Sequence, residues 1–120
     1  MFTPNTEFVT VLDKNIIVHQ SNLILASKLN LAQDEYRDKV NIENPDIDPL
    51  EFSLIYNYCI PMVVCSECVN GEMFTAEELA HLPEIETDKL FAAVRKINPH
   101  WFPEYKANSN PEAELEKKSR

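Results

Sequence analysis

The pattern of hydrophobic residues changes at Ser21, and this change separates the first two predicted elements of the chain. Between residues 7 and 19, β-branched and aromatic residues flank the polar stretch Asp13-Lys14-Asn15, which predicts a β-hairpin over residues 7–19. From Ser21 onward the spacing lengthens to steps of three and four, which predicts an amphipathic helix near residues 22–40. The apolar face of this helix comprises Leu25, Leu29, Ala32, Tyr36 and Val40.

Capping residues and a proline shape a second helix, predicted over residues 49–69. The pair Asp48-Pro49 supplies an N-cap carboxylate and a proline suited to the first helical position, where no N–H is needed. Pro61 removes one backbone hydrogen bond, so the helix is expected to bend or end there. We expect residues 62–69 to form a buried helical continuation that stops at Gly71 in the left-handed conformation.

Two shorter helices are predicted in the second half of the chain. Thr75 and Glu78 form a capping-box pattern that begins a helix over residues 75–82. A last helix is predicted over residues 87–98, because apolar residues recur at helical spacing and Pro99 follows its end. The apolar residues of this last helix are Leu90, Phe91, Val94 and Ile97.

Length and composition indicate one domain. The chain has 120 residues, of which 44% are hydrophobic and 26% charged, a composition typical of a globular protein with one core. We predict a mainly α fold of about four helices, preceded by the hairpin, over residues 1–103. Residues 104–120 are rich in charged and small polar side chains, which predicts a flexible tail. The single glycine excludes the Gly-rich phosphate loops of nucleotide-binding enzymes.

Negative charge is concentrated in the middle of the chain. The net charge is −9, and residues 41–88 hold 11 acidic side chains and no Lys or Arg. Residues 89–120 are net basic, with 7 Lys or Arg against 4 acids. An acidic field repels the phosphate backbone, so we expect a protein partner and no nucleic acid. The alternative is that the acidic stretch only keeps the domain in solution.

Three cysteines and one histidine are the candidate metal ligands: Cys59, Cys65, Cys68 and His81. Cys65 and Cys68 have the two-residue gap of a zinc-binding pair, but a single histidine makes an incomplete second half of a structural site. Cys59 falls on an apolar helical face, where a small thiol packs well. The acidic stretch offers no Lys or Arg to activate a redox pair, and the histidines are scattered. We therefore predict no metal, no cofactor and no catalytic residue.

Two aromatic residues held between prolines, Trp101 and Phe102, form a candidate contact surface. Pro99 and Pro103 restrict the backbone of this segment. The two rings either fold back as a lid on the helical core or form an exposed anchor for a partner.

The order of features from Asp48 to Asn98 resembles the tail assembly chaperones of long-tailed bacteriophages, which are small, mostly helical and often acidic. An apolar helix in the position of Leu50 to Cys68 precedes a Thr-x-Glu-Glu cap at Thr75. A Leu-Pro stop follows at Leu82-Pro83, and a final helix of the pattern Leu-x-x-Ala-Val-x-x-Ile-Asn runs from Leu90 to Asn98.

The resemblance implies a non-catalytic protein of the host cytoplasm. Such a protein coats the long tape measure protein before the tail tube polymerises around it, and it is absent from the mature virion. In many such families a programmed frameshift extends the chain, and the added domain recruits the tail tube protein. The pair Lys117-Lys118 is compatible with an A-rich slippery site. The sequence has no apolar run of transmembrane length and no signal-peptide pattern, so we expect no membrane association.

A chaperone for a helical client needs an exposed apolar groove ringed with charge. We expect the surplus aliphatic residues within the acidic stretch to line this groove, and the alternative is that they are ordinary core. These residues are Ile55, Met62, Val63 and Val64. A homo-oligomer in the absence of the client is compatible with such a surface. The rival function is an acidic inhibitor of a host defence protein, which imitates the charge of nucleic acid.

Overall fold

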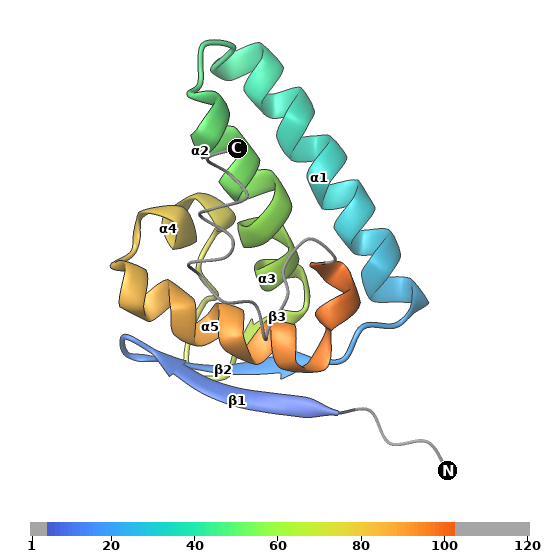
Figure 1. Cartoon of the computed structure of the whole chain (residues 1–120), viewed down its shortest axis with the longest axis vertical. Helices are drawn as coiled ribbons and strands as arrows, with labels where there is room; N and C mark the ends of the chain where they lie inside the picture. Colours follow the sequence, from blue (N-terminus) through green and yellow to red (C-terminus); the bar gives the residue numbers. More distant parts are fainter. Residues whose placement is uncertain (1–4, 103–120) are drawn as a thin grey trace, which may run out of the picture.

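The computed structural model describes residues 5–102, which form a small antiparallel sheet with a layer of helices on one face (Figure 1). The elements are β1 (Thr6–Val11), β2 (Lys14–His19), α1 (Leu23–Glu43), α2 (Pro49–Leu54), the π-helical turn η1 (Ile55–Cys59), α3 (Ile60–Val64), β3 (Ser66–Cys68), α4 (Ala76–His81), α5 (Glu84–Ile97) and the 3-10 turn η2 (Pro99–Trp101). The predicted mainly helical class is confirmed. The tail predicted over residues 104–120 lies outside the described residues. Every helix within residues 5–102 is too short or too polar to span a lipid bilayer.

The predicted hairpin is present, but its turn lies one position earlier than expected. β1 pairs antiparallel with β2, and the turn falls on Leu12 and Asp13. Leu12 adopts the left-handed conformation at φ 54°, which costs about 1–2 kcal/mol for a residue with a Cβ atom. Two long-range bonds hold this turn. The Leu12 N–H donates to the Glu86 carboxylate at 3.3 Å, and the Asn70 side-chain amide donates to the Asp13 carbonyl at 2.9 Å.

A third strand replaces the predicted end of the second helix. The expectation that residues 62–69 stay helical is wrong beyond Val64, because the chain turns at Cys65 and continues as β3. The structure also gives Gly71 no left-handed conformation. β2 would otherwise leave one row of N–H and C=O groups unpaired, and pairing with β3 satisfies them.

The pairing of β3 with β2 extends beyond the strand itself. The N–H of His19 donates to the Cys65 carbonyl at 2.7 Å, and the N–H of Val69 donates to the Asn15 carbonyl at 2.9 Å. The strand order is β1-β2-β3, so β2 is central and β1 lies at an edge.

The outer edge of β1 is open in the part of the chain that the structure describes. Alternation along an antiparallel pair directs the backbone groups of Thr6, Phe8 and Thr10 away from β2. The Phe8 side chain is exposed on the sheet face opposite the helices. Glu7 is the only charged residue of β1, and its carboxylate pairs with the Lys96 ammonium of α5 at 2.9 Å.

Pro61 lies inside a helical segment that runs without interruption from α2 to α3. The sequence predicts a bend or an end at this proline, and the structure instead widens the preceding turn into η1. The N–H of Ile60 bonds to the carbonyl of Ile55, five residues earlier. A π-helical turn of this kind relieves the contact between a proline ring and the carbonyl four residues before it.

The other helix boundaries are close to prediction. The Asn22 side chain accepts a hydrogen bond from the Leu25 N–H at 2.8 Å and caps α1, while Thr75 and Glu78 form the predicted reciprocal capping box of α4. The start of α5 is Glu84 and not the predicted residue 87, and Pro83 occupies the N-cap position.

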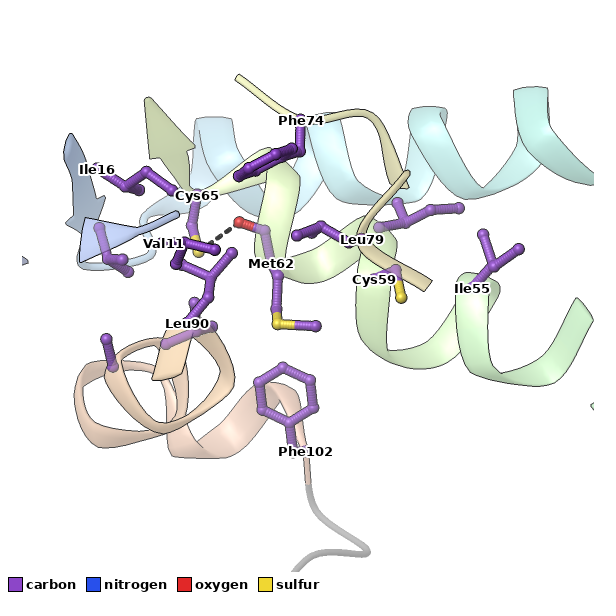
Figure 2. Packing of buried hydrophobic residues seen from close by; sticks show 14 of the residues in the cluster. Val11, Ile16, Ile55, Cys59, Met62, Cys65, Phe74, Leu79, Leu90 and Phe102 are labelled. Atoms are coloured by element: carbon purple, nitrogen blue, oxygen red, sulfur yellow. Dashed lines mark hydrogen bonds between the residues drawn. The ribbon is translucent and has the colours of Figure 1, made fainter. Parts of the chain in front are cut away.

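The core lies between the inner face of the sheet, α5 and the α2–α3 segment. Figure 2 shows Met62 near its centre, between Leu90 of α5 and the ring of Phe102. The predicted apolar face of α1 packs against this core, with Tyr36 and Val40 buried. The remaining buried apolar residues are Val11, Ile16, Val18, Ile55, Cys59, Ile60, Cys65, Phe74, Leu79, Ala93 and Val94.

Asn98 is the one buried polar residue among residues 5–102, and sequence analysis did not identify it. Its side-chain oxygen accepts a hydrogen bond from the Ser21 N–H at 2.7 Å. Its side-chain amide donates to the His19 carbonyl at 3.0 Å. Its backbone N–H bonds to the Val94 carbonyl and ends α5. Asn98 therefore joins the end of β2 and the start of α1 to the end of α5.

We expect Asn98→Ala to lower the free energy of unfolding by about 2–3 kcal/mol, because it leaves a backbone N–H and a carbonyl without their partners. Urea denaturation followed by circular dichroism measures this change. The matched control is Asn41→Ala on the exposed face of α1, expected to change stability by less than about 0.5 kcal/mol. Equal midpoints for the two variants would contradict the role given to Asn98.

Candidate functional site

An open groove of about 500 Å³ lies between the α2–η1–α3 segment, α4 and the first half of α5, and we term it the α4–α5 groove. Most of the side chains that line it are apolar. The lining residues are Leu54, Tyr58, Cys59, Met62, Leu79, Ala80, Leu82, Glu84, Thr87, Asp88 and Phe91.

One wall of the α4–α5 groove is a face of α5, and a hydrogen bond holds α4 beside it. On α5, Glu84, Thr87, Asp88 and Phe91 recur at steps of three, one and three, so they share one side of the helix. A hydrogen bond fixes α4 against this wall, because the Thr87 hydroxyl donates to the Leu79 carbonyl at 3.0 Å. This bond ties the α5 wall of the groove to α4, whose residues Leu79 and Ala80 also line it.

The floor and the rim of the α4–α5 groove differ in exposure. Cys59, Met62 and Leu79 are buried and form its floor. Leu54 stands on the rim with 45% of its surface exposed. An apolar rim residue of this exposure is available to a partner without any rearrangement of the core.

An aromatic cluster lies at the Phe91 side of the groove. The Phe91 and Phe102 ring centroids are 5.0 Å apart in an edge-to-face arrangement, and Tyr58 lies 5.8 Å from Phe91 and 5.9 Å from Phe102. Phe102 is buried, and Trp101 is half-buried against the core. Both rings fold back on the core as the lid alternative describes, Phe102 completely and Trp101 in part, and a role of Trp101 in partner binding stays a prediction.

Charge is distributed unevenly around the α4–α5 groove. Glu84 and Asp88 are exposed and are the carboxylates of its lining. At the aromatic side, the Arg95 guanidinium lies over the Phe91 ring, 4.9 Å from the ring centroid. Away from the guanidinium, the rim of the groove is acidic and favours cationic groups on a partner.

The acidic surroundings extend from the groove to α1. The pKa of Tyr36 is raised above its usual value, first by burial and then by the carboxylates of Glu77 and Glu51. These two carboxylates are also paired, Glu77 with Lys39 at 3.4 Å and Glu51 with His81 at 3.1 Å.

The structure separates the four aliphatic residues that were expected to line an exposed groove. Ile55 and Met62 are buried, so their predicted exposure is wrong and the core alternative holds for them. Val63 and Val64 are half-buried and line a smaller hollow of about 250 Å³ between α1, α3 and α4. Met62 alone of the four reaches the α4–α5 groove, where it forms part of the floor.

The candidate metal ligands do not converge. Within residues 5–102, no group of three or more His, Cys, Asp or Glu side chains is placed to hold a metal ion. Cys59 and Cys65 are buried in the core, and Cys68 lies on β3 with its sulfur 3.1 Å from the Asn70 side-chain oxygen. His81 bonds to Glu51 instead.

Burial controls the chemistry of two thiols. It raises the pKa of Cys59 and of Cys65 to about 11, from an ordinary value of 9.0. At neutral pH both thiols are protonated, and a protonated thiol is a weak nucleophile and a weak metal ligand. Cys59 therefore contributes an apolar surface to the groove floor.

We expect the free energy of unfolding to fall as the pH rises from 9 to 11, because the unfolded chain releases the Cys65 proton before the native protein does. The contribution of Cys65 is at most about 1.4 kcal/mol per pH unit. Urea denaturation across this range measures the slope. Cys65→Ala is expected to reduce this slope without abolishing it, because the pKa of Cys59 is raised to the same value. An unchanged slope in Cys65→Ala would contradict this linkage.

Sequence analysis missed four wall residues as contact residues: Leu54, Tyr58, Leu82 and Phe91. Leu54, Tyr58 and Phe91 fall on helix faces that periodicity assigns to the core. Periodicity does not show where a neighbouring helix stops covering such a face. The available signal was the Leu82-Pro83 stop, which shortens α4 and leaves the wall uncovered. No protein-family model, curated protein or solved structure matches the chain.

Proposed function

We propose that this chain is a non-catalytic binding protein whose α4–α5 groove holds the apolar face of a helical client. The observation that carries the proposal is the groove, which has an apolar floor, an exposed apolar rim at Leu54 and carboxylates at Glu84 and Asp88. Grooves of this composition take amphipathic helices, whose side chains enter at helical spacing.

The charge around the α4–α5 groove specifies the client more closely. Glu84 and Asp88 belong to the acidic stretch of residues 41–88, which has no Lys or Arg. A client helix with Lys or Arg beside its apolar stripe would place its cations over these carboxylates. Such complementarity speeds association and disfavours anionic partners.

The resemblance of residues 48–98 to phage tail assembly chaperones gives the proposal a specific form. In this form the client is the tape measure protein, the complex forms in the host cytoplasm, and a frameshifted longer product contacts the tail tube protein. A long helical client is compatible with a groove that is open to solvent, because one stretch of its apolar face enters the groove while the rest of the helix lies outside it.

The rival function, an acidic inhibitor that imitates nucleic acid, is less well supported. Such a mimic presents its carboxylates as free charges. Here Glu51 and Glu77 already pair with His81 and Lys39, and the α4–α5 groove is lined mostly by apolar side chains. The two functions differ in their response to salt, because apolar contacts persist when charges are screened.

We expect Leu54→Glu to weaken client binding about tenfold, because it places a carboxylate on the apolar rim. The probe is a fluorescently labelled synthetic amphipathic helix of leucine and lysine, titrated by fluorescence anisotropy at low and moderate salt. The control is Leu50→Glu, also on α2 and 65% exposed but outside the groove. It adds the same charge and is expected to retain wild-type affinity.

The charge of the new side chain makes this test selective. A cationic probe held only by electrostatic attraction would bind Leu54→Glu at least as tightly as the wild type and would be released by moderate salt. That result would contradict the groove and favour the acidic inhibitor. Weaker binding by Leu54→Glu that persists in salt supports the groove.

The tape measure client is tested at the level of the gene. We expect an adenine-rich slippery sequence over Lys117-Lys118, an overlapping reading frame beyond it, and a very long open reading frame for a helical protein downstream. DNA sequencing of the locus provides this information. A locus without these three features would remove the specific client and leave the binding function of the groove unaffected.

A further inference from the structure

The outer face of α1 carries apolar residues that the fold does not use. Ile24, Leu31 and Ile42 are 66%, 59% and 82% exposed, on the side opposite the buried Tyr36 and Val40. At 3.6 residues per turn these three side chains fall within about 20° of one another around the helix axis. Figure 1 shows α1 along one side of the molecule.

Three charged residues complete a regular seam between these apolar positions. Ile24, Lys28, Leu31, Glu35, Asp38 and Ile42 follow one another at steps of four, three, four, three and four, and all are exposed. This is the heptad spacing by which two helices pack along a shared seam. The seam covers most of α1, which is about 31 Å long at 1.5 Å per residue.

The seam is complementary to itself when two copies run antiparallel. In this arrangement Ile24 lies opposite Ile42 of the second copy. Lys28 then lies opposite Asp38 of the second copy, and Leu31 lies opposite Glu35 of the second copy. Of the six layers, the two at the ends are Ile24–Ile42 pairs and the two next to them are Lys28–Asp38 pairs, while the two central layers place Leu31 against Glu35. A parallel arrangement in register would instead bring each charged residue against itself, which is repulsive.

The charges that this pairing needs are available. Lys28 takes part in no ion pair within residues 5–102. Asp38 contacts the Arg37 guanidinium at 3.5 Å, but its side chain is 68% exposed and keeps acceptor capacity for a second cation.

We propose that α1 mediates a homodimer in which the two helices pack antiparallel along this seam. The polar Lys–Asp layers fix the register, as polar residues at seam positions do in coiled coils. The dimer interface lies on α1, whereas the α4–α5 groove is formed by α2 to α5. Dimerisation therefore leaves both grooves open, so this inference does not depend on the proposed function.

Sedimentation equilibrium of the full chain tests the dimer. We expect a concentration-dependent dimer for the wild type and a monomer for Ile42→Asp, whose exposed side chain leaves the core untouched. Leu50→Asp, a substitution of a similarly exposed residue on α2, is the control and is expected to retain the wild-type dimer. Circular dichroism verifies that each variant is folded.

A charge exchange tests the antiparallel register. We expect Lys28→Asp alone to weaken the dimer about tenfold or more, because it places two acids opposite each other at both Lys–Asp layers. The double variant Lys28→Asp with Asp38→Lys is expected to recover most of the lost affinity. A monomeric wild type, a dimer that survives Ile42→Asp, or a double variant as weak as Lys28→Asp would each overturn the proposal.

Discussion

The hydrogen bonds of Asn98 are the constraint on which the arrangement of the layers depends. This side chain is fully buried and meets the end of β2, the start of α1 and the end of α5 at one point. A buried amide is stable only when its donors and acceptors are paired, so these three chain segments keep a fixed relation. The point at which α1 leaves the sheet is therefore fixed relative to the end of α5.

The same constraint gives the α4–α5 groove a rigid wall. α5 is held near its first turn by Glu86, which accepts from the Leu12 N–H of the hairpin turn, and near its last turn by the Lys96–Glu7 pair and Asn98. The Lys89 ammonium also bonds the Glu86 carboxylate at 3.1 Å and, together with the Leu12 N–H, lowers the pKa of that carboxyl. A wall fixed at both ends loses little conformational freedom when a partner binds, which favours affinity.

Residue spacing and capping patterns predicted the elements that depend on residues close together in the sequence. They did not predict the features that depend on contacts between residues far apart in the sequence. The hairpin, the face of α1 and the capping box at Thr75 follow from spacing and capping chemistry. β3 depends on the free edge of β2, and the partners of Asn98 lie 77 and 79 residues away along the chain. In the second helix the apolar pattern was recognised, but spacing alone did not separate buried from exposed positions. Ile55 is core, Met62 is a buried part of the groove floor, and the exposed rim belongs to Leu54.

The open edge of β1 is a site at which two copies of the chain could pair, and the net charge of the chain opposes this pairing. Thr6, Phe8 and Thr10 direct backbone groups outward, and the strand has no lysine, proline or bulge of the kind that prevents edge-to-edge association. Its one charge, Glu7, is neutralised by Lys96. Repulsion between copies that each carry a net charge of −9 therefore opposes stacking of these edges. That repulsion is lost near the isoelectric point of about 4.7, so in acid the six-residue edge of β1 is no longer protected by net charge from pairing with another copy.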